Sequence, residues 1–110
     1  MNKIPNKINI LGRQFTVSVR NRDRDGTGEL ASARYATQEI WIEEDSHVQV
    51  QQEGLIHETL EMLNTMCELN IDHEKISILG VTLYQVLTEN KLSFEYTEND
   101  SVKGEEIENE

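Results

Sequence analysis

The 110 residues suffice for one domain with a single modest core, since only 36% of them are hydrophobic and 5% aromatic. The net charge of -11 disfavours a protein that binds DNA or RNA through phosphates, because that mode needs clustered lysine and arginine side chains. No apolar run approaches the length of a membrane span, and the N-terminus lacks the apolar region of a signal peptide. We therefore expect an acidic cytoplasmic protein that contacts neither nucleic acid nor a membrane.

The N-terminal part of the chain predicts a β hairpin. Its strands are expected at residues 7–11 and 14–20, and apolar and polar side chains alternate along the second one. Gly12 and Arg13 lie between these segments and supply a two-residue turn. A polar, glycine-containing loop is then expected over residues 21–32.

A further strand is expected at residues 39–43. Ile40 and Ile42 should face a core helix, whereas Trp41 should either point to the other side of the sheet or rest against the loop. A short strand around residues 34–36 precedes this segment and would form a second hairpin with it. Together these strands predict a small antiparallel sheet.

The longest helix is expected over residues 48–69. Asp45 or Ser46 can cap it by accepting hydrogen bonds from the first free backbone N–H groups. Gly54 costs this helix about 1 kcal/mol relative to alanine, which indicates that a neighbouring strand approaches closely there. An apolar stripe along the helix comprises Ile56, Leu60, Leu63 and Cys67. Cys67 is therefore expected to be a buried small hydrophobic residue.

A second helix is expected over residues 73–88, with Asp72 as its cap. Because the link between the helices is short, they should be antiparallel neighbours. The apolar face of the second helix comprises Ile76, Leu79, Leu83 and Val86. The fold class that follows is α+β, a small antiparallel sheet packed on an antiparallel pair of helices.

The chain ends in a strongly acidic segment. Residues 92–96 form either a last strand or an extended arm, and residues 97–110 hold too little apolar surface to fold. We expect a single domain over residues 1–96, followed by a disordered acidic tail over residues 97–110.

The first helix contains the pattern H-E-x-x-E at residues 57–61. His57 and Glu61 lie one helical turn apart, so one metal ion could bind both side chains. Glu58 occupies the position that a zinc metallopeptidase with H-E-x-x-H gives to its general base. Glu61 replaces the second histidine of that motif, and a carboxylate is also an accepted zinc ligand. A glutamate-rich surface helix without a metal is the alternative interpretation.

A third metal ligand must come from elsewhere, and the start of the second helix offers His73 and Glu74. His73 is either a ligand or a polar residue beside the helix cap, depending on how the two helices cross. Glu74 is either a ligand or an acidic residue that interacts favourably with the helix N-terminus. His47, near the start of the first helix, is expected to be exposed.

Four segments carry a resemblance to a known family: INILG at 8–12, QEIWI at 38–42, IHETLE at 56–61 and ISILGVTLYQVLTEN at 76–90. Their order and spacing resemble the small zincin-like proteins encoded by bacteriophages and prophages. Those proteins are distant relatives of the SprT-like and ImmA/IrrE-like metallopeptidases. The resemblance covers roughly residues 7–92 and leaves the acidic tail unexplained.

This resemblance implies a minimal zincin-like fold and a zinc-dependent metallopeptidase in the cytoplasm of a bacterial host. His57 and Glu61 match the first two ligand positions, and Glu58 matches the catalytic base. His73 is the best match for the third ligand, with Glu74 as the alternative. An extended peptide substrate would add to the edge of the sheet along the strand at 39–43.

The missing second histidine of the motif supports an alternative function. In that case the chain keeps a zincin-like frame without catalysis, and it binds and modulates a host protein. The candidate partners are therefore a peptide substrate or a host protein, and the resemblance leaves the oligomeric state open.

Overall fold

The computed structural model describes residues 4–21 and 29–92. Its elements of secondary structure are β1 (Lys7–Ile10), β2 (Arg13–Arg20), β3 (Ala31–Arg34), β4 (Glu39–Glu43), α2 (Val48–Cys67) and α3 (His73–Glu89). The arm and the acidic tail expected after residue 92 lie outside the described residues, as does most of the loop expected over residues 21–32.

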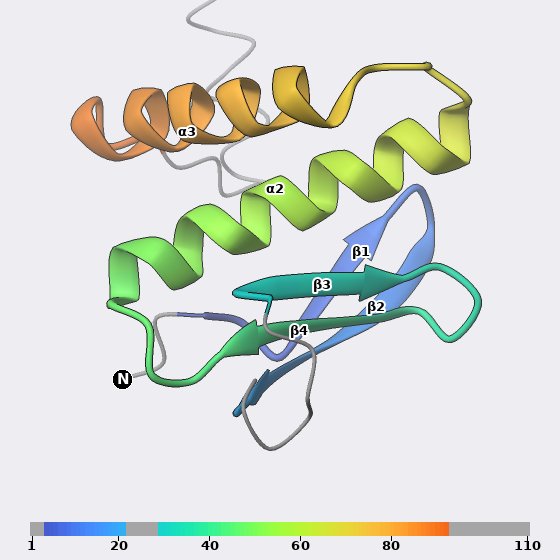
Figure 1. The fold of residues 1–110 in the computed structure, drawn as a ribbon, viewed down its shortest axis with the longest axis horizontal. Coiled ribbons are helices and arrows are strands. Elements are labelled where there is room, and N and C mark those ends of the chain that lie inside the picture. The colour runs from blue at the N-terminus through green and yellow to red at the C-terminus, as the bar shows by residue number, and fades with distance from the viewer. Residues whose placement is uncertain (1–3, 22–28, 93–110) are drawn as a thin grey trace, which may run out of the picture.

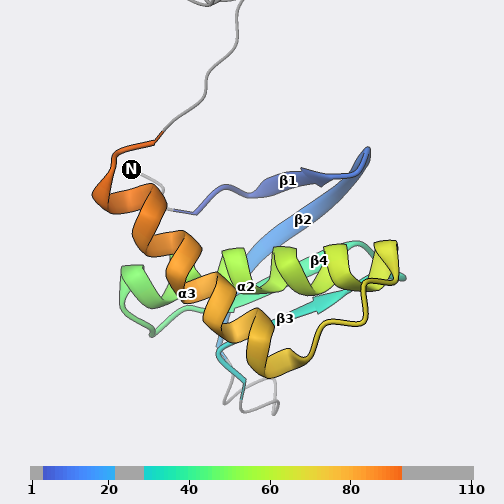
Figure 2. The ribbon, with the colours of Figure 1, turned by 90° about the horizontal axis from the view of Figure 1, so that it is seen from above.

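The described elements form three layers. The sheet is the first layer, α2 lies across one of its faces, and α3 lies on the side of α2 away from the sheet (Figure 1). Seen from above, α3 crosses α2 obliquely while returning in the opposite general direction (Figure 2). The expected α+β class is confirmed, but α3 packs on α2 and not on the sheet.

The sheet is mixed, so the prediction of an antiparallel sheet was wrong. Its strand order is β1-β2-β4-β3, and the pairs β1–β2 and β4–β3 are antiparallel, whereas β2 and β4 are parallel. Residues 21–30 separate β2 from β3, which is too long for a tight hairpin turn. The chain can therefore reach the far edge of the sheet before β3 begins, and β4 then lies beside β2. Local sequence signals for hairpins contain no information about such a non-local pairing.

The first hairpin turn lies one residue earlier than predicted. Leu11 and Gly12 form it, with φ angles of 50° and 79°, and Ile10 pairs with Arg13 across it. Two consecutive positive φ angles are typical of a type I′ turn, whose twist matches that of the flanking strands.

The short strand expected around residues 34–36 was also misplaced, because β3 spans Ala31–Arg34. Residues 35–38 form the turn instead, and Gln38 has a φ angle of 54°. The Gln38 side chain donates a hydrogen bond to the Gln14 carbonyl oxygen at 2.8 Å, which ties this turn to β2. The positive φ angle of Gln38 places this residue in the turn and not in a strand.

The hydrophobic core lies between the sheet and α2 and comprises Ile10, Phe15, Val17, Ile40, Ile42 and Met62. As predicted, Ile40 and Ile42 point into this core, and both are fully buried. Each large apolar side chain buried in this way contributes about 1.5–3 kcal/mol to stability. From α2, the partly buried Leu55, Leu63 and Met66 complete the packing.

The start of α2 is capped by a residue that the sequence did not predict. The His47 ring accepts a hydrogen bond at Nδ1 from the Gln49 backbone N–H at 3.1 Å, so neither Asp45 nor Ser46 is the cap. His47 is exposed, as expected. Asp72 is the N-cap residue of α3, as predicted, but its carboxylate makes no capping hydrogen bond.

The interior of α2 confirms one prediction and corrects another. A Cβ atom built on Gly54 would lie 3.3 Å from the Ala31 Cβ atom of β3, so glycine does permit a close approach of a strand. Cys67, by contrast, is exposed and not buried. The physical reason is that Met62, Leu63 and Met66 supply the core contacts, and the helix ends at Cys67 beyond them.

The apolar face predicted for α3 is mostly uncovered. Ile76 is 1% exposed, but Leu79, Leu83 and Val86 are 48%, 41% and 39% exposed. Because α3 packs on a single helix, only the narrow stripe through Ile76 and Gly80 is buried. Within the described residues, neither helix combines the length and the apolar character that a membrane span requires.

Candidate metal centre

Helix α2 places three polar side chains of the H-E-x-x-E pattern at the centre of the molecule. His57 and Glu61 are one turn apart, and the Nε2 atom of His57 lies 3.3 Å from Oε2 of Glu61. The side chains of His57 and Glu61 are 18% and 25% exposed, so both are sheltered without being sealed from solvent.

The link between the helices carries His73 back to these two residues. The backbone reverses through Glu68 and Asn70, whose φ angles are 52° and 59°. The Asn64 side chain then bonds the Ile71 backbone twice, donating to its carbonyl oxygen and accepting from its N–H, each at 3.0 Å. Sequence reasoning assigned no role to Asn64, although its position one turn after Glu61 on the same face was a usable signal.

His73, the first residue of α3, completes a cluster of three candidate ligands. Its Nδ1 atom lies 2.6 Å from Glu61 Oε2, and its ring meets the His57 ring edge to face with centroids 5.0 Å apart. One ligand atom from each of His57, Glu61 and His73 lies within 4.8 Å of the other two. The alternative ligand Glu74 is exposed and, among the described residues, is not part of this group.

The spacing and chemistry of this cluster fit a divalent metal ion. A tetrahedral zinc site with bonds of about 2.0–2.1 Å places its ligand atoms roughly 3.3 Å apart. The His57–Glu61 separation is 3.3 Å, and the Glu61–His73 hydrogen bond of 2.6 Å needs to open only slightly. Two imidazoles and one carboxylate are also a donor set that several first-row divalent ions accept.

Glu58 lies beside the three candidate ligands, with its Oε2 atom 3.9 Å from Nε2 of His57. Its side chain is only 12% exposed. Burial raises the pKa of Glu58 to about 7, the nearby Glu61 and Glu29 carboxylates add to this rise, and His73 opposes it. A carboxyl group with a pKa near neutrality can both accept and release a proton, as a general acid–base catalyst must.

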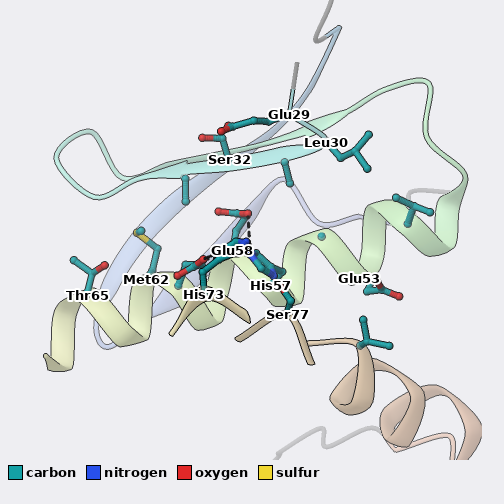
Figure 3. Close-up of a pocket in the computed structure, with 16 residues that line it drawn as sticks. Glu29, Leu30, Ser32, Glu53, His57, Glu58, Met62, Thr65, His73 and Ser77 are labelled. Carbon is teal, nitrogen blue, oxygen red and sulfur yellow. Dashed lines mark hydrogen bonds and ion pairs between the residues drawn. The ribbon is translucent and has the colours of Figure 1, made fainter. Parts of the chain in front are cut away.

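A cleft of about 730 Å³ passes over this cluster, with α2 as its floor, β3 as one wall and the start of α3 as the other (Figure 3). Glu58, His57 and His73 lie near the middle of this cleft (Figure 3). α3 passes close to α2 here, since a Cβ atom at Gly80 would be in van der Waals contact with the His57 Cα atom at 3.5 Å.

The strand that borders the cleft is β3, not the segment at 39–43 that the sequence favoured for peptide binding. That segment is β4, which pairs with β2 on one side and with β3 on the other, so neither of its edges can accept a further strand. Within the described residues, β3 pairs with β4 alone. Among the described strands, the edge of the sheet on the cleft side is therefore that of β3.

Each candidate site residue can now be placed. His57, Glu58, Glu61 and His73 come together in the cleft, whereas Glu74 and His47 are exposed outside it. Comparisons with protein-family models, with curated proteins and with solved structures found no match to the chain.

Proposed function

We propose that this chain is a zinc-dependent peptidase of the small zincin-like kind encoded by bacteriophages. His57, Glu61 and His73 hold the metal, and Glu58 handles the proton. The observation that carries this proposal is the convergence of three ligand atoms from two helices within 4.8 Å, next to a carboxyl group whose pKa is raised to about 7.

The chemistry is the hydrolysis of a peptide bond. His57, Glu61 and His73 would hold a zinc ion, which would lower the pKa of a bound water and polarise the substrate carbonyl. Glu58 accepts a proton as the water oxygen bonds to the carbonyl carbon. When the carbon–nitrogen bond breaks, Glu58 passes this proton to the leaving amine, so the carboxylate is regenerated.

The shape of the cleft suits an extended peptide. Its floor on α2 runs from Val50 to Thr65, which at 1.5 Å per residue is roughly 22 Å. An extended chain of about six or seven residues has this length. The edge of β3 can bind such a chain through backbone hydrogen bonds, in the manner of an added strand.

A binding protein without catalysis is the second candidate, and one contact favours it. Glu61 and His73 already form a hydrogen bond of 2.6 Å, so the cluster can be satisfied without a metal. In this case the cleft would hold a segment of a host protein without cleaving it.

Zinc content tests the metal site itself. We expect about one zinc ion per chain in protein purified without added metal, and almost none in His57→Ala. His47→Ala is the matched control, because His47 is exposed and outside the cleft, and it should retain the zinc. Equal and negligible zinc in the native chain and in His57→Ala would end the metal hypothesis.

Glu58→Gln then tests catalysis apart from metal binding. This variant should keep its zinc and lose hydrolysis of a quenched fluorescent peptide library by at least about a hundredfold. Unchanged hydrolysis in Glu58→Gln would remove Glu58 from the mechanism. Zinc binding without any hydrolysis by the native chain would favour the binding protein.

A further inference from the structure

The two ends of the cleft differ in chemical character. Leu30 and Glu53 lie at one end, Met62 and Thr65 lie at the other, and the candidate metal ligands lie between them (Figure 3). Val50 and Val81 also line the cleft. We call the end with Leu30, Val50, Glu53 and Val81 the acidic end of the cleft.

Three apolar side chains at the acidic end are open to solvent. Leu30, Val50 and Val81 are 48%, 41% and 50% exposed. Leu30 directly precedes β3, whereas Val50 belongs to α2 and Val81 to α3. Apolar surface from three separate segments around one cleft can bury the methylene groups of a long side chain.

Glu53 adds a negative charge to this apolar surface. It makes no hydrogen bond or ion pair in the described structure, and its side chain is partly buried. Of the described residues that line the cleft, none is lysine or arginine. Glu53 precedes His57 by one helical turn, so the two lie about 6 Å apart along the helix axis.

We propose that the acidic end of the cleft is a subsite for a lysine or arginine side chain of the bound peptide. The methylene stem lies against Leu30, Val50 and Val81, and the cationic head pairs with the Glu53 carboxylate. Side chains on one face of an extended chain repeat every 6.6–6.8 Å or so, which is close to the Glu53–His57 offset. The basic residue therefore lies within two positions of the residue opposite His57.

This inference rests on the proposed function for the path of the peptide, but its test does not require hydrolysis. The probes are fluorescein-labelled heptapeptides in which one lysine is moved along an otherwise neutral sequence. All of them have the same net charge, so the general attraction of a chain with a net charge of -11 is equal for each. Fluorescence anisotropy with the Glu58→Gln protein, with and without zinc, gives their dissociation constants.

We expect one lysine position to bind about two- to fivefold more tightly than the others, which is the size expected for one partly exposed charged contact. Norleucine at that position, which keeps the stem without the charge, should bind with intermediate affinity. Adding Glu53→Gln should abolish the advantage of lysine over norleucine. Adding Glu68→Gln, which removes an exposed carboxylate outside the cleft, should leave it intact.

Equal affinity for all lysine positions would overturn the subsite, and so would a preference that survives Glu53→Gln. Neither result concerns zinc content or Glu58-dependent hydrolysis, so the proposed peptidase would stand. Conversely, a lysine preference that depends on Glu53 in a chain without zinc or hydrolysis would keep the subsite and reject the peptidase.

Discussion

The two helices contribute to the candidate metal centre in opposite ways. α2 lies between the sheet and α3 and supplies three sheltered groups, since the side chains of His57, Glu58 and Glu61 are at most 25% exposed. α3 packs mainly on α2 among the described elements and supplies His73, whose side chain is 71% exposed. One helix thus fixes its site residues by packing, and the other delivers a single ligand from its first turn.

This contrast indicates where the site is vulnerable. The positions of His57 and Glu61 depend on the packing of α2 against the core, so changes in the core would disturb them. The position of His73 depends on two local features, the crossing of the helices at Gly80 and the link fixed by Asn64.

Gly80→Leu should separate the helices. A Cβ atom fits at this position at 3.5 Å from the His57 Cα atom. The longer leucine side chain adds three carbon atoms beyond this contact, and we expect them to push the helices apart. We expect a loss of about 3 kcal/mol in the free energy of unfolding and at least a tenfold loss of zinc affinity. Gly80→Ala is the matched control and should be tolerated or slightly stabilising, because alanine favours a helix. Urea unfolding measures the free energy of unfolding, and zinc titration measures the affinity. Equal values for the two variants would show that the helices do not pack tightly at Gly80.

Glu58→Gln should stabilise the metal-free protein at high pH while it removes catalysis. The pKa of Glu58 is raised from 4.5 to about 7, so the fold favours the protonated form. The contribution of protonated Glu58 to the free energy of unfolding is complete below about pH 4.5 and is lost as the pH rises through about 7. Glutamine stays neutral, so the variant should gain about 1–3 kcal/mol at pH 8 and less at pH 5.5.

The measurement is urea unfolding at these two pH values in the presence of a chelator. Glu68→Gln, at an exposed position, should show no such dependence on pH. If Glu58→Gln were no more stable than the native chain at pH 8, burial of the ionised Glu58 carboxylate would not destabilise the fold.

The same contrast explains how much of the site the sequence could predict. His57, Glu58 and Glu61 lie within one helical turn, so their spacing alone places them together. The approach of His73 depends on the link and on the crossing of two helices, and the sequence therefore left His73 and Glu74 open. Local spacing predicts a cluster within one element, whereas a ligand from a second element requires tertiary geometry.

The fold shows the same limit. Both hairpins follow from adjacent strand segments, but the parallel pairing of β2 with β4 joins segments that no turn connects. For α3, the helical period predicts that Leu79, Leu83 and Val86 share a face but not whether a neighbour covers that face. The His47 cap was missed because aspartate and serine are the usual caps, and both occur just before it.

Asn64→Ala should loosen the link between the helices. It removes both hydrogen bonds to the Ile71 backbone at a partly buried site, which should cost about 1–2 kcal/mol in the free energy of unfolding. Zinc affinity should fall severalfold, because His73 is no longer held near Glu61. Asn64→Asp keeps the acceptor for the Ile71 N–H but not the donor for its carbonyl oxygen, so it should show an intermediate loss. Unchanged zinc affinity in Asn64→Ala would mean that helix packing alone positions His73.

His47→Asp should have the smallest effect and should act on α2 alone. The His47 ring already accepts the capping hydrogen bond from Gln49, so the geometry for a capping side chain exists. Aspartate is a stronger cap, and its charge also interacts favourably with the positive end of the helix dipole, which together should add about 0.5–1 kcal/mol. Because His47 is exposed and lies outside the cleft, zinc affinity should not change. A higher midpoint of thermal unfolding with constant zinc affinity would show that α2 can be stabilised without moving its ligands. A parallel change in zinc affinity would mean that the start of α2 and the metal centre are coupled through the helix.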